Sequence, residues 1–205
     1  MLAQGGVDTI DTTMKGQRTR SYFGVYTVID YPDRAMRMLV HGTTLHGQQS
    51  TDPARSRETT TYYGPGSGVG LALQEAPALF GANARVGVVG LGTGTLACWG
   101  RPGQDWTFFE IDPAVLAMSE EGVFTYLDHC APDAEVELGD ARLRLEEGPP
   151  ARFDMLVIDA FSSDSIPLHL LTVEAMGAYL RAVPPGGVIL LHISNRYITL
   201  EPMIA

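Results

Sequence analysis

RVGVVGLGTGTLA, residues 85–97, decides the fold of this chain of 205 residues. The run before Gly90 has the apolar composition of a buried strand, and Gly90, Gly92 and Gly94 then allow a tight turn just where a helix begins. Backbone N–H groups at such a turn can approach a ligand closely. The stretch therefore predicts a strand, a ligand-binding loop and a helix. Alone, it does not separate dinucleotide binding from S-adenosylmethionine binding.

Four more apolar runs follow, with segments between them that can form helices. They are WTFFEI, AEVEL, FDMLVI and GGVILLHI. Five strands with crossover helices predict an α/β fold: a Rossmann-like, doubly wound, mostly parallel sheet of the S-adenosylmethionine-dependent methyltransferase type. We expect this nucleoside-binding domain to span residues 81–205. Because the chain ends soon after the fifth run, its C-terminal strands are expected to be missing.

Residues 1–80 differ in composition, being rich in Thr, Gly and Tyr, and are expected to form a small β region with a loop. SYFGVYTVIDY (residues 21–31) and RAMRMLVHG (residues 34–42) alternate enough to predict strands of a small N-terminal antiparallel sheet, with YPDR as the turn. The polar, glycine-rich segment at residues 46–68 predicts a loop.

Acidic residues stand at the ends of three successive predicted strands. Glu110 lies twenty residues after Gly90, where an acid accepts hydrogen bonds from ribose hydroxyls. Asp140 ends the third strand and could accept a bond from an adenine amino group. Asp159 directly follows the fourth run, and Asp164 lies five residues further on. These last two either face a positively charged substrate or, in the case of Asp164, cap the next helix.

The composition restricts the partners. A net charge of −10, from 24 acids and 14 bases, argues against nucleic acid or an anionic membrane and is compatible with a cationic small-molecule amine. No run approaches the roughly 20 apolar residues of a membrane helix, so we expect a soluble, cytoplasmic chain. Cys98 and Cys130 lack metal-ligand spacing; they predict reduced thiols and no metal site. No role is assigned to His41, His46 or His192, because a lone histidine is more often structural.

Taken together, the motifs resemble a known family. VGVVGLGTGTLA, FFEIDPAV, GDARLRL and DMLVIDAFSSD, in this order, resemble the spermidine synthase superfamily of aminopropyltransferases. DAFSSDSIPLHLLTVEAM and HISNRY are most similar to its spermidine synthase-like branch, some of whose members are fused to transporter-like membrane segments. The resemblance covers roughly residues 20–205. It implies an enzyme of polyamine synthesis that transfers an aminopropyl group from decarboxylated S-adenosylmethionine to a polyamine.

The resemblance also implies roles for individual residues. The three glycines would border the sulfonium nucleoside, Glu110 would hold its ribose, and Asp140 with Ala141 its adenine. Asp159 would orient and deprotonate the attacking amine, with Asp164 as a second acid, and Tyr62 or Tyr63 would line the pocket. A carboxylate is a suitable base here, because an ammonium group is not nucleophilic until it loses a proton.

Three departures keep other functions open. The loop reads GLGTGT rather than GGGDGG, the acids are spaced as DAFSSD rather than D-S-S-D-P, and YYG replaces the triplet Y-H-E or Y-Q-E. The first of these is closer to methyltransferases. The alternatives are an S-adenosylmethionine-dependent methyltransferase, a sulfonium cyclase or lyase, and a non-catalytic nucleoside-binding module; a nicotinamide dehydrogenase is more distant. Without the closing strands, the sheet would expose an edge, so a homo-oligomer is expected.

Overall fold

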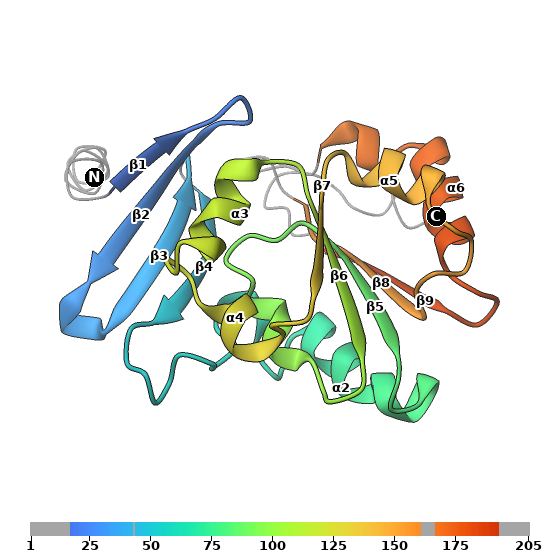
Figure 1. Ribbon diagram of the computed structural model, residues 1–205, viewed down its shortest axis with the longest axis horizontal. Helices are drawn as coiled ribbons and strands as arrows, with labels where there is room; N and C mark the ends of the chain where they lie inside the picture. The colour runs from blue at the N-terminus through green and yellow to red at the C-terminus, as the bar shows by residue number, and fades with distance from the viewer. Residues whose placement is uncertain (1–16, 43, 161–166, 193–205) are drawn as a thin grey trace, which may run out of the picture.

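The computed structural model describes residues 17–42, 44–160 and 167–192 of the protein. Figure 1 shows a small sheet at one end of the molecule and a second sheet, flanked by helices, at the other. Within the described residues the small sheet is antiparallel and has four strands, and the second is parallel and has five. This arrangement confirms the predicted fold class.

The small sheet has the strand order β1-β2-β3-β4. Its strands are β1 (Gln17–Arg20), β2 (Val25–Tyr31), β3 (Met36–His41) and β4 (Thr44–Ser50). A 3₁₀ turn at Pro32–Arg34 joins β2 to β3, as predicted from YPDR. The prediction of a loop from residue 46 onward was wrong for the first part of that segment. There β4 pairs with β3 as far as Ser50, because backbone pairing can form a strand from polar residues.

The parallel sheet has the order β7-β6-β5-β8-β9. Its strands are β5 (Arg85–Val89), β6 (Asp105–Glu110), β7 (Glu135–Leu138), β8 (Met155–Ile158) and β9 (Val188–Leu191). After β5, the chain adds β6 and β7 on one side of this strand. It then crosses back and adds β8 and β9 on the other side. The reversal lies between β5 and β8, and ligands of open parallel sheets bind at such a point, beyond the carboxyl ends of the strands.

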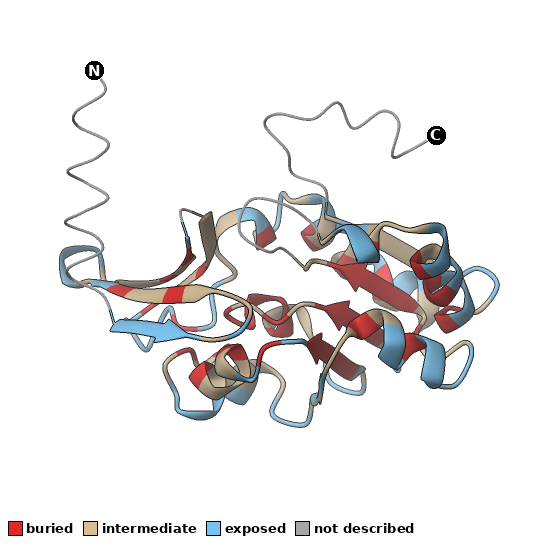
Figure 2. Cartoon of the chain, turned by 90° about the horizontal axis from the view of Figure 1, so that it is seen from above, coloured by how far each residue is buried: buried red, intermediate tan, exposed pale blue. Residues whose placement is uncertain are grey.

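Side chains alternate across this sheet and form two cores. The helices of the described chain are α2 (Gly68–Phe80), α3 (Pro113–Glu120), α4 (Tyr126–Cys130), α5 (Ala141–Glu147) and α6 (Val173–Ala182). Val88 and Phe108 belong to the core on one face, under α2 and α3, whereas Val89 and Phe109 belong to the core on the other face, under α5 and α6. Figure 2 shows the buried strands between the helical layers.

The helices differ from the predictions in three places. Helix α2 was not predicted; it begins at the N-cap Ser67 and covers a segment that was assigned to the N-terminal β region. The glycine loop leads into a short 3₁₀ helix, η3 (Thr95–Trp99), rather than a long helix. The helical segment after β6 is divided into α3 and α4, because Gly122 adopts a positive φ of 72°. The predicted division into residues 1–80 and 81–205 stays a prediction.

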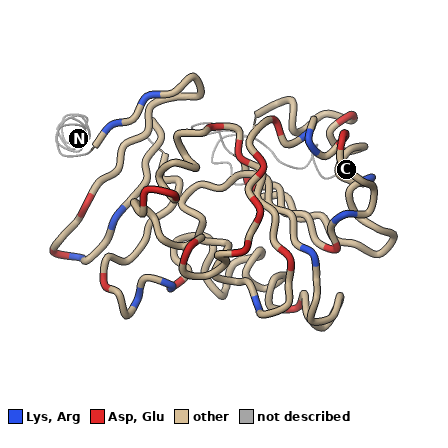
Figure 3. Tube along the Cα trace, in the orientation of Figure 1, with Lys and Arg blue, Asp and Glu red and all other residues tan. Residues whose placement is uncertain are grey.

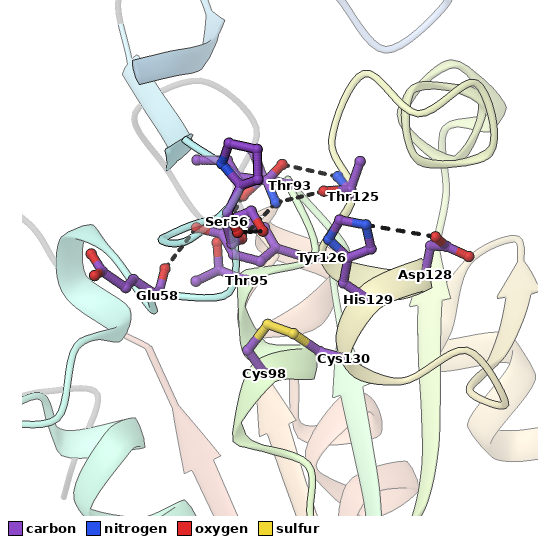
Figure 4. Close-up of a disulfide and its surroundings, with 12 residues drawn as sticks. Ser56, Glu58, Thr93, Thr95, Cys98, Thr125, Tyr126, Asp128, His129 and Cys130 are labelled. Carbon is purple, nitrogen blue, oxygen red and sulfur yellow. Dashed lines mark hydrogen bonds and ion pairs between the residues drawn. A yellow bond between two sulfur atoms is a disulfide. The ribbon is translucent and has the colours of Figure 1, made fainter. Parts of the chain in front are cut away.

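A disulfide joins Cys98 to Cys130, so the prediction of reduced cysteines was wrong. Figure 4 shows the bonded sulfur atoms between η3 and α4. The spacing of 32 residues gave no signal, but the packing of these two helices brings the Cα atoms to 4.8 Å, within the range of a disulfide. Disulfides are rare in reducing compartments, so the cysteines no longer support the cytoplasmic location, which stays a prediction.

Charged residues of both signs are spread along the chain. Figure 3 shows acidic and basic residues at many points of the described trace. Among the residues in the described ranges, no helix has both the length and the apolar character needed to cross a membrane.

Candidate functional site

The site forms between β5 and β8, where the strand order of the parallel sheet reverses. Gly90 follows β5 and Asp159 follows β8, and the Asp159 N–H donates to the Val89 carbonyl at 2.8 Å. Gly90 has a φ of 98°, and a Cβ atom at this position would lie 2.5 Å from the Asp159 carbonyl oxygen. Only glycine fits this position without strain. The glycine loop and the fourth-strand acid are therefore in direct contact.

A cavity of about 270 Å³ opens at this point, between the two sheets. The small sheet supplies aromatic walls through Phe23, in the turn between β1 and β2, Tyr26 in β2 and His41 in β3. Seven of the residues predicted for the site line this first cavity: Tyr62, Tyr63, Gly90, Gly92, Glu110, Ala141 and Asp159. They come from segments separated by up to about a hundred residues, so the strand order has gathered them as the strand-end rule predicted.

Glu110 is buried at the end of β6, with 8% of its surface exposed. Its carboxylate accepts hydrogen bonds from the N–H groups of Leu91 at 3.0 Å and Asp112 at 2.9 Å. Burial raises the pKa of Glu110, and these N–H donors oppose the shift. Each carboxylate oxygen keeps a second lone pair, so ribose hydroxyls can still donate to this group. The predicted ribose contact thus has a fixed acceptor in the cavity wall.

Three predicted residues are not in the described lining of this cavity. Gly94 lies at the N-terminus of η3. Asp140 is the N-cap of α5, where it accepts from the Arg142 N–H at 2.9 Å; it also lies 3.6 Å from His169, which does line the cavity. Its adenine contact stays a prediction. Asp164 falls outside the described residues.

Asp159 is held through both of its carboxylate oxygens. The Tyr63 hydroxyl donates to Oδ2 at 2.6 Å, and Nδ1 of His192 lies 2.5 Å from Oδ1. Only 6% of the Asp159 side chain is exposed. Burial, with the Asp159 charge adding to it, raises the pKa of Tyr63 well above its ordinary value, so this tyrosine remains a neutral donor. The carboxylate therefore has a fixed orientation.

A second cavity of about 490 Å³ adjoins the first. Asp159, Tyr62 and Tyr63 line both cavities, so the two meet at these side chains. The rest of the described lining is largely apolar: Val69, Leu96, Val157, Leu190 and Leu191, with Ser67, Gly68 and His192. Two ligands that occupied the two cavities would meet at Asp159.

His192 and His169 are site residues that the sequence did not single out. His192 directly follows β9, and its N–H donates to the Ile158 carbonyl at 2.9 Å, beside Asp159. The rule that residues at the carboxyl ends of the strands face the ligand was applied to the first four strands. It also applied to the fifth, since His192 lies at the end of the run GGVILLHI. His169 follows Pro167 in a short turn and carried no comparable signal.

Comparisons with known proteins support the same fold. No protein-family model matches the sequence, and no curated protein matches it significantly. Among solved structures, a probable spermidine synthase from Corynebacterium glutamicum has a TM-score of 0.69 at 18% identity, covering 86% of this chain and 63% of its own. The spermidine synthase from Thermotoga maritima has a TM-score of 0.61 at 16% identity, covering 82% and 53%.

Human methyltransferase-like protein 13, in complex with SAH, has a TM-score of 0.52 at 21% identity, covering 65% of each chain. The present chain thus spans about half to two thirds of the length of these proteins. Likeness at such low identity is evidence of the fold. The chain has an S-adenosylmethionine-dependent methyltransferase-like Rossmann fold preceded by a small N-terminal β-sheet.

Proposed function

We propose that the protein is a transferase of the spermidine synthase type. It would transfer the aminopropyl group of decarboxylated S-adenosylmethionine to a polyamine, within polyamine synthesis, with Asp159 as the base that accepts a proton from the attacking amine. The observation that carries this proposal is the pair of cavities that meet at Asp159. The first cavity is the nucleoside site, which a methyltransferase would need as well. The second cavity is where the amine that accepts the aminopropyl group would bind.

The first cavity suits an adenosyl sulfonium compound. Gly90 allows the backbone to lie close to a ligand, Glu110 offers acceptors for ribose hydroxyls, and Phe109 and Leu170 add apolar walls. Aromatic rings such as Tyr63 also attract a cationic sulfur. These residues fit the nucleoside that the spermidine synthases are known to use, although the roles of the single residues remain proposals.

The charge of the first cavity favours the decarboxylated compound. Among the described lining residues, Glu110 and Asp159 are acidic and none is lysine or arginine. Burial lowers the pKa of His41, so this ring is a poor cation. The carboxylate of intact S-adenosylmethionine would therefore meet like charges, whereas a free aminopropyl group would be attracted.

The second cavity suits the acceptor. Its apolar side chains can pack against the methylene groups of an aliphatic amine, and Asp159 can hold the ammonium group where the two cavities adjoin. One proton of the ammonium group passes to Asp159. The neutral nitrogen then forms a bond to the carbon next to sulfur as the carbon–sulfur bond breaks, the electron pair of that bond stays on sulfur, and methylthioadenosine leaves. Holding the two partners in line supplies much of the rate. The acceptor's identity and a homo-oligomeric state remain proposals.

Calorimetry with S-adenosylmethionine, its decarboxylated form and methylthioadenosine tests the donor, and product analysis with added diamines and monoamines tests the transfer. We expect the decarboxylated form to bind more tightly and an aminopropylated amine to appear. Asp159→Asn should lower turnover by about 10²–10⁴-fold while methylthioadenosine binding persists. Unchanged turnover in this variant would remove Asp159 from the reaction.

Methyl transfer is the second candidate, because the loop GLGTGT is of methyltransferase type and the fold is shared with methyltransferase-like protein 13. Tighter binding of intact S-adenosylmethionine, with methylated product, would favour it. Binding of the nucleoside without any product would favour a non-catalytic module.

A further inference from the structure

Tyr63, whose hydroxyl holds Asp159, belongs to a short turn that depends on contacts from outside it. The turn η2 (Thr61–Tyr63) is three residues long. Thr61 has a φ of 57°, in the left-handed region that residues other than glycine rarely adopt. Such a conformation costs free energy and persists only where the surrounding structure imposes it. The position of Tyr63 is therefore set by the groups that anchor this turn.

The indole of Trp99 is one such anchor. Its Nε1–H donates a hydrogen bond to the Tyr63 carbonyl at 2.9 Å. Trp99 is the last residue of η3, the short helix that follows the glycine loop, and its ring is partly buried against the core under α2 and α3. Gly70 of α2 lies directly against this ring, since a Cβ atom at Gly70 would lie 3.0 Å from Cζ2 of Trp99. Packing therefore holds the indole, and its N–H has a fixed direction.

Trp99 does not itself reach the reacting groups. It is not among the described residues that line either cavity, whereas Tyr63 lines both. Tyr63 is hydrogen-bonded at its two ends: its carbonyl accepts from Trp99, and its hydroxyl donates to Asp159 Oδ2 at 2.6 Å. We propose that Trp99 is a positioning residue of the transfer reaction and acts on Asp159 through Tyr63. This inference rests on the proposed function.

The direction of the Asp159 carboxylate matters because this group must meet the ammonium group of the acceptor where the two cavities adjoin. A misplacement of about 1 Å can lower a rate by about 10²-fold. Without the indole N–H, the turn can shift against η3, and the Tyr63 hydroxyl moves with it. Oδ2 of Asp159 then loses its fixed partner. The nucleoside contacts at Gly90 and Glu110 do not include Trp99, so they should persist.

Trp99→Phe removes the donor and keeps an aromatic ring in a partly buried position, so the fold should persist, which the midpoint of urea unfolding checks. With decarboxylated S-adenosylmethionine and the amine that the wild type uses best, we expect kcat to fall by about 10–10²-fold. The KM of the nucleoside, and the affinity for methylthioadenosine in calorimetry, should stay within about twofold of the wild type. A general loosening of the site would change these two quantities as well.

Trp106→Phe is the matched control. The indole Nε1–H of Trp106 also donates a hydrogen bond, to Gln104 at 3.3 Å, and Trp106 is not among the described residues that line either cavity. Its side chain is more deeply buried than that of Trp99, so this variant carries at least a comparable packing defect. It should retain the wild-type kcat.

A double-mutant cycle tests whether Trp99 acts through Tyr63. Tyr63→Phe removes the hydroxyl that holds Asp159 and should lower kcat by a similar factor. If Trp99 acts through this hydroxyl, adding Trp99→Phe to Tyr63→Phe should change kcat by less than about twofold. Two independent effects would multiply instead.

The outcomes distinguish this inference from the proposed function. A wild-type kcat in Trp99→Phe, or a loss by the same factor with and without the Tyr63 hydroxyl, would overturn the role of Trp99 and leave aminopropyl transfer standing. Weaker methylthioadenosine binding in Trp99→Phe would show that the indole supports the nucleoside site rather than Asp159, and would also refute the inference. A wild type that binds methylthioadenosine but transfers nothing to any amine would overturn the proposed function, and the inference with it.

Discussion

The disulfide between Cys98 and Cys130 should make the stability of the protein depend strongly on redox conditions. The bond closes a loop with a sequence separation of 32 residues, which includes β6 and Glu110. A cross-link of this length removes enough chain entropy from the unfolded state to stabilise the fold by about 3.7 kcal/mol near room temperature. Reduction should lower the free energy of unfolding by about that amount.

Urea unfolding, followed by circular dichroism with and without a reductant, measures this difference. We expect the midpoint to fall on reduction by about 1–4 M urea, which is the expected loss of about 3.7 kcal/mol divided by the slope of about 1–3 kcal/mol per M that is typical of small proteins in urea. The double variant Cys98→Ser, Cys130→Ser is the control: it should unfold near the midpoint of the reduced protein and should not respond to the reductant.

Two results would refute the reasoning. One is an equal midpoint for the oxidised and reduced protein, which would mean that the bond does not restrict the unfolded chain. The other is the detection of two free thiols in the folded, unreduced protein, which would mean that η3 and α4 pack together without a covalent bond.

Three further predictions concern the walls of the first cavity. Glu110→Gln should weaken methylthioadenosine binding in calorimetry. In the wild type, the affinity should be full above the raised pKa of Glu110 and should fall as the pH falls through that pKa. The variant should lack this pH dependence. Gly90→Ala should destabilise the fold by at least about 1–2 kcal/mol in urea unfolding, because of its positive φ and the Asp159 carbonyl, whereas Gly66→Ala, with open space around it, should change little. Tyr63→Phe should lower the free energy of unfolding by about 1.5–3 kcal/mol, because it removes a hydrogen bond to a buried carboxylate; an unchanged midpoint would contradict the role of Tyr63 in holding Asp159.

The sequence alone was sufficient to predict the fold class and part of the lining of the first cavity. Apolar runs and glycine turns are local signals, so the five strands of the parallel sheet and the loop at Gly90 could be predicted from neighbouring residues. The rule that ligands bind beyond the carboxyl ends of strands then predicted that Glu110 and Asp159 face one cavity, and they do. Helix α2 was missed because the glycines at its start continue the glycine-rich segment before it, which resembled a loop.

Only the tertiary structure determined which groups meet at Asp159. Tyr63 is 96 residues away from it in sequence and His192 is 33 residues away. They reach it because β8 pairs with β5 on one side and β9 on the other, and because the turn at Thr61–Tyr63 lies over this edge. The disulfide is also non-local, since it depends on the packing of η3 against α4. Local sequence patterns specify strands and turns, whereas pairs of side chains distant in sequence are brought together by strand order and helix packing.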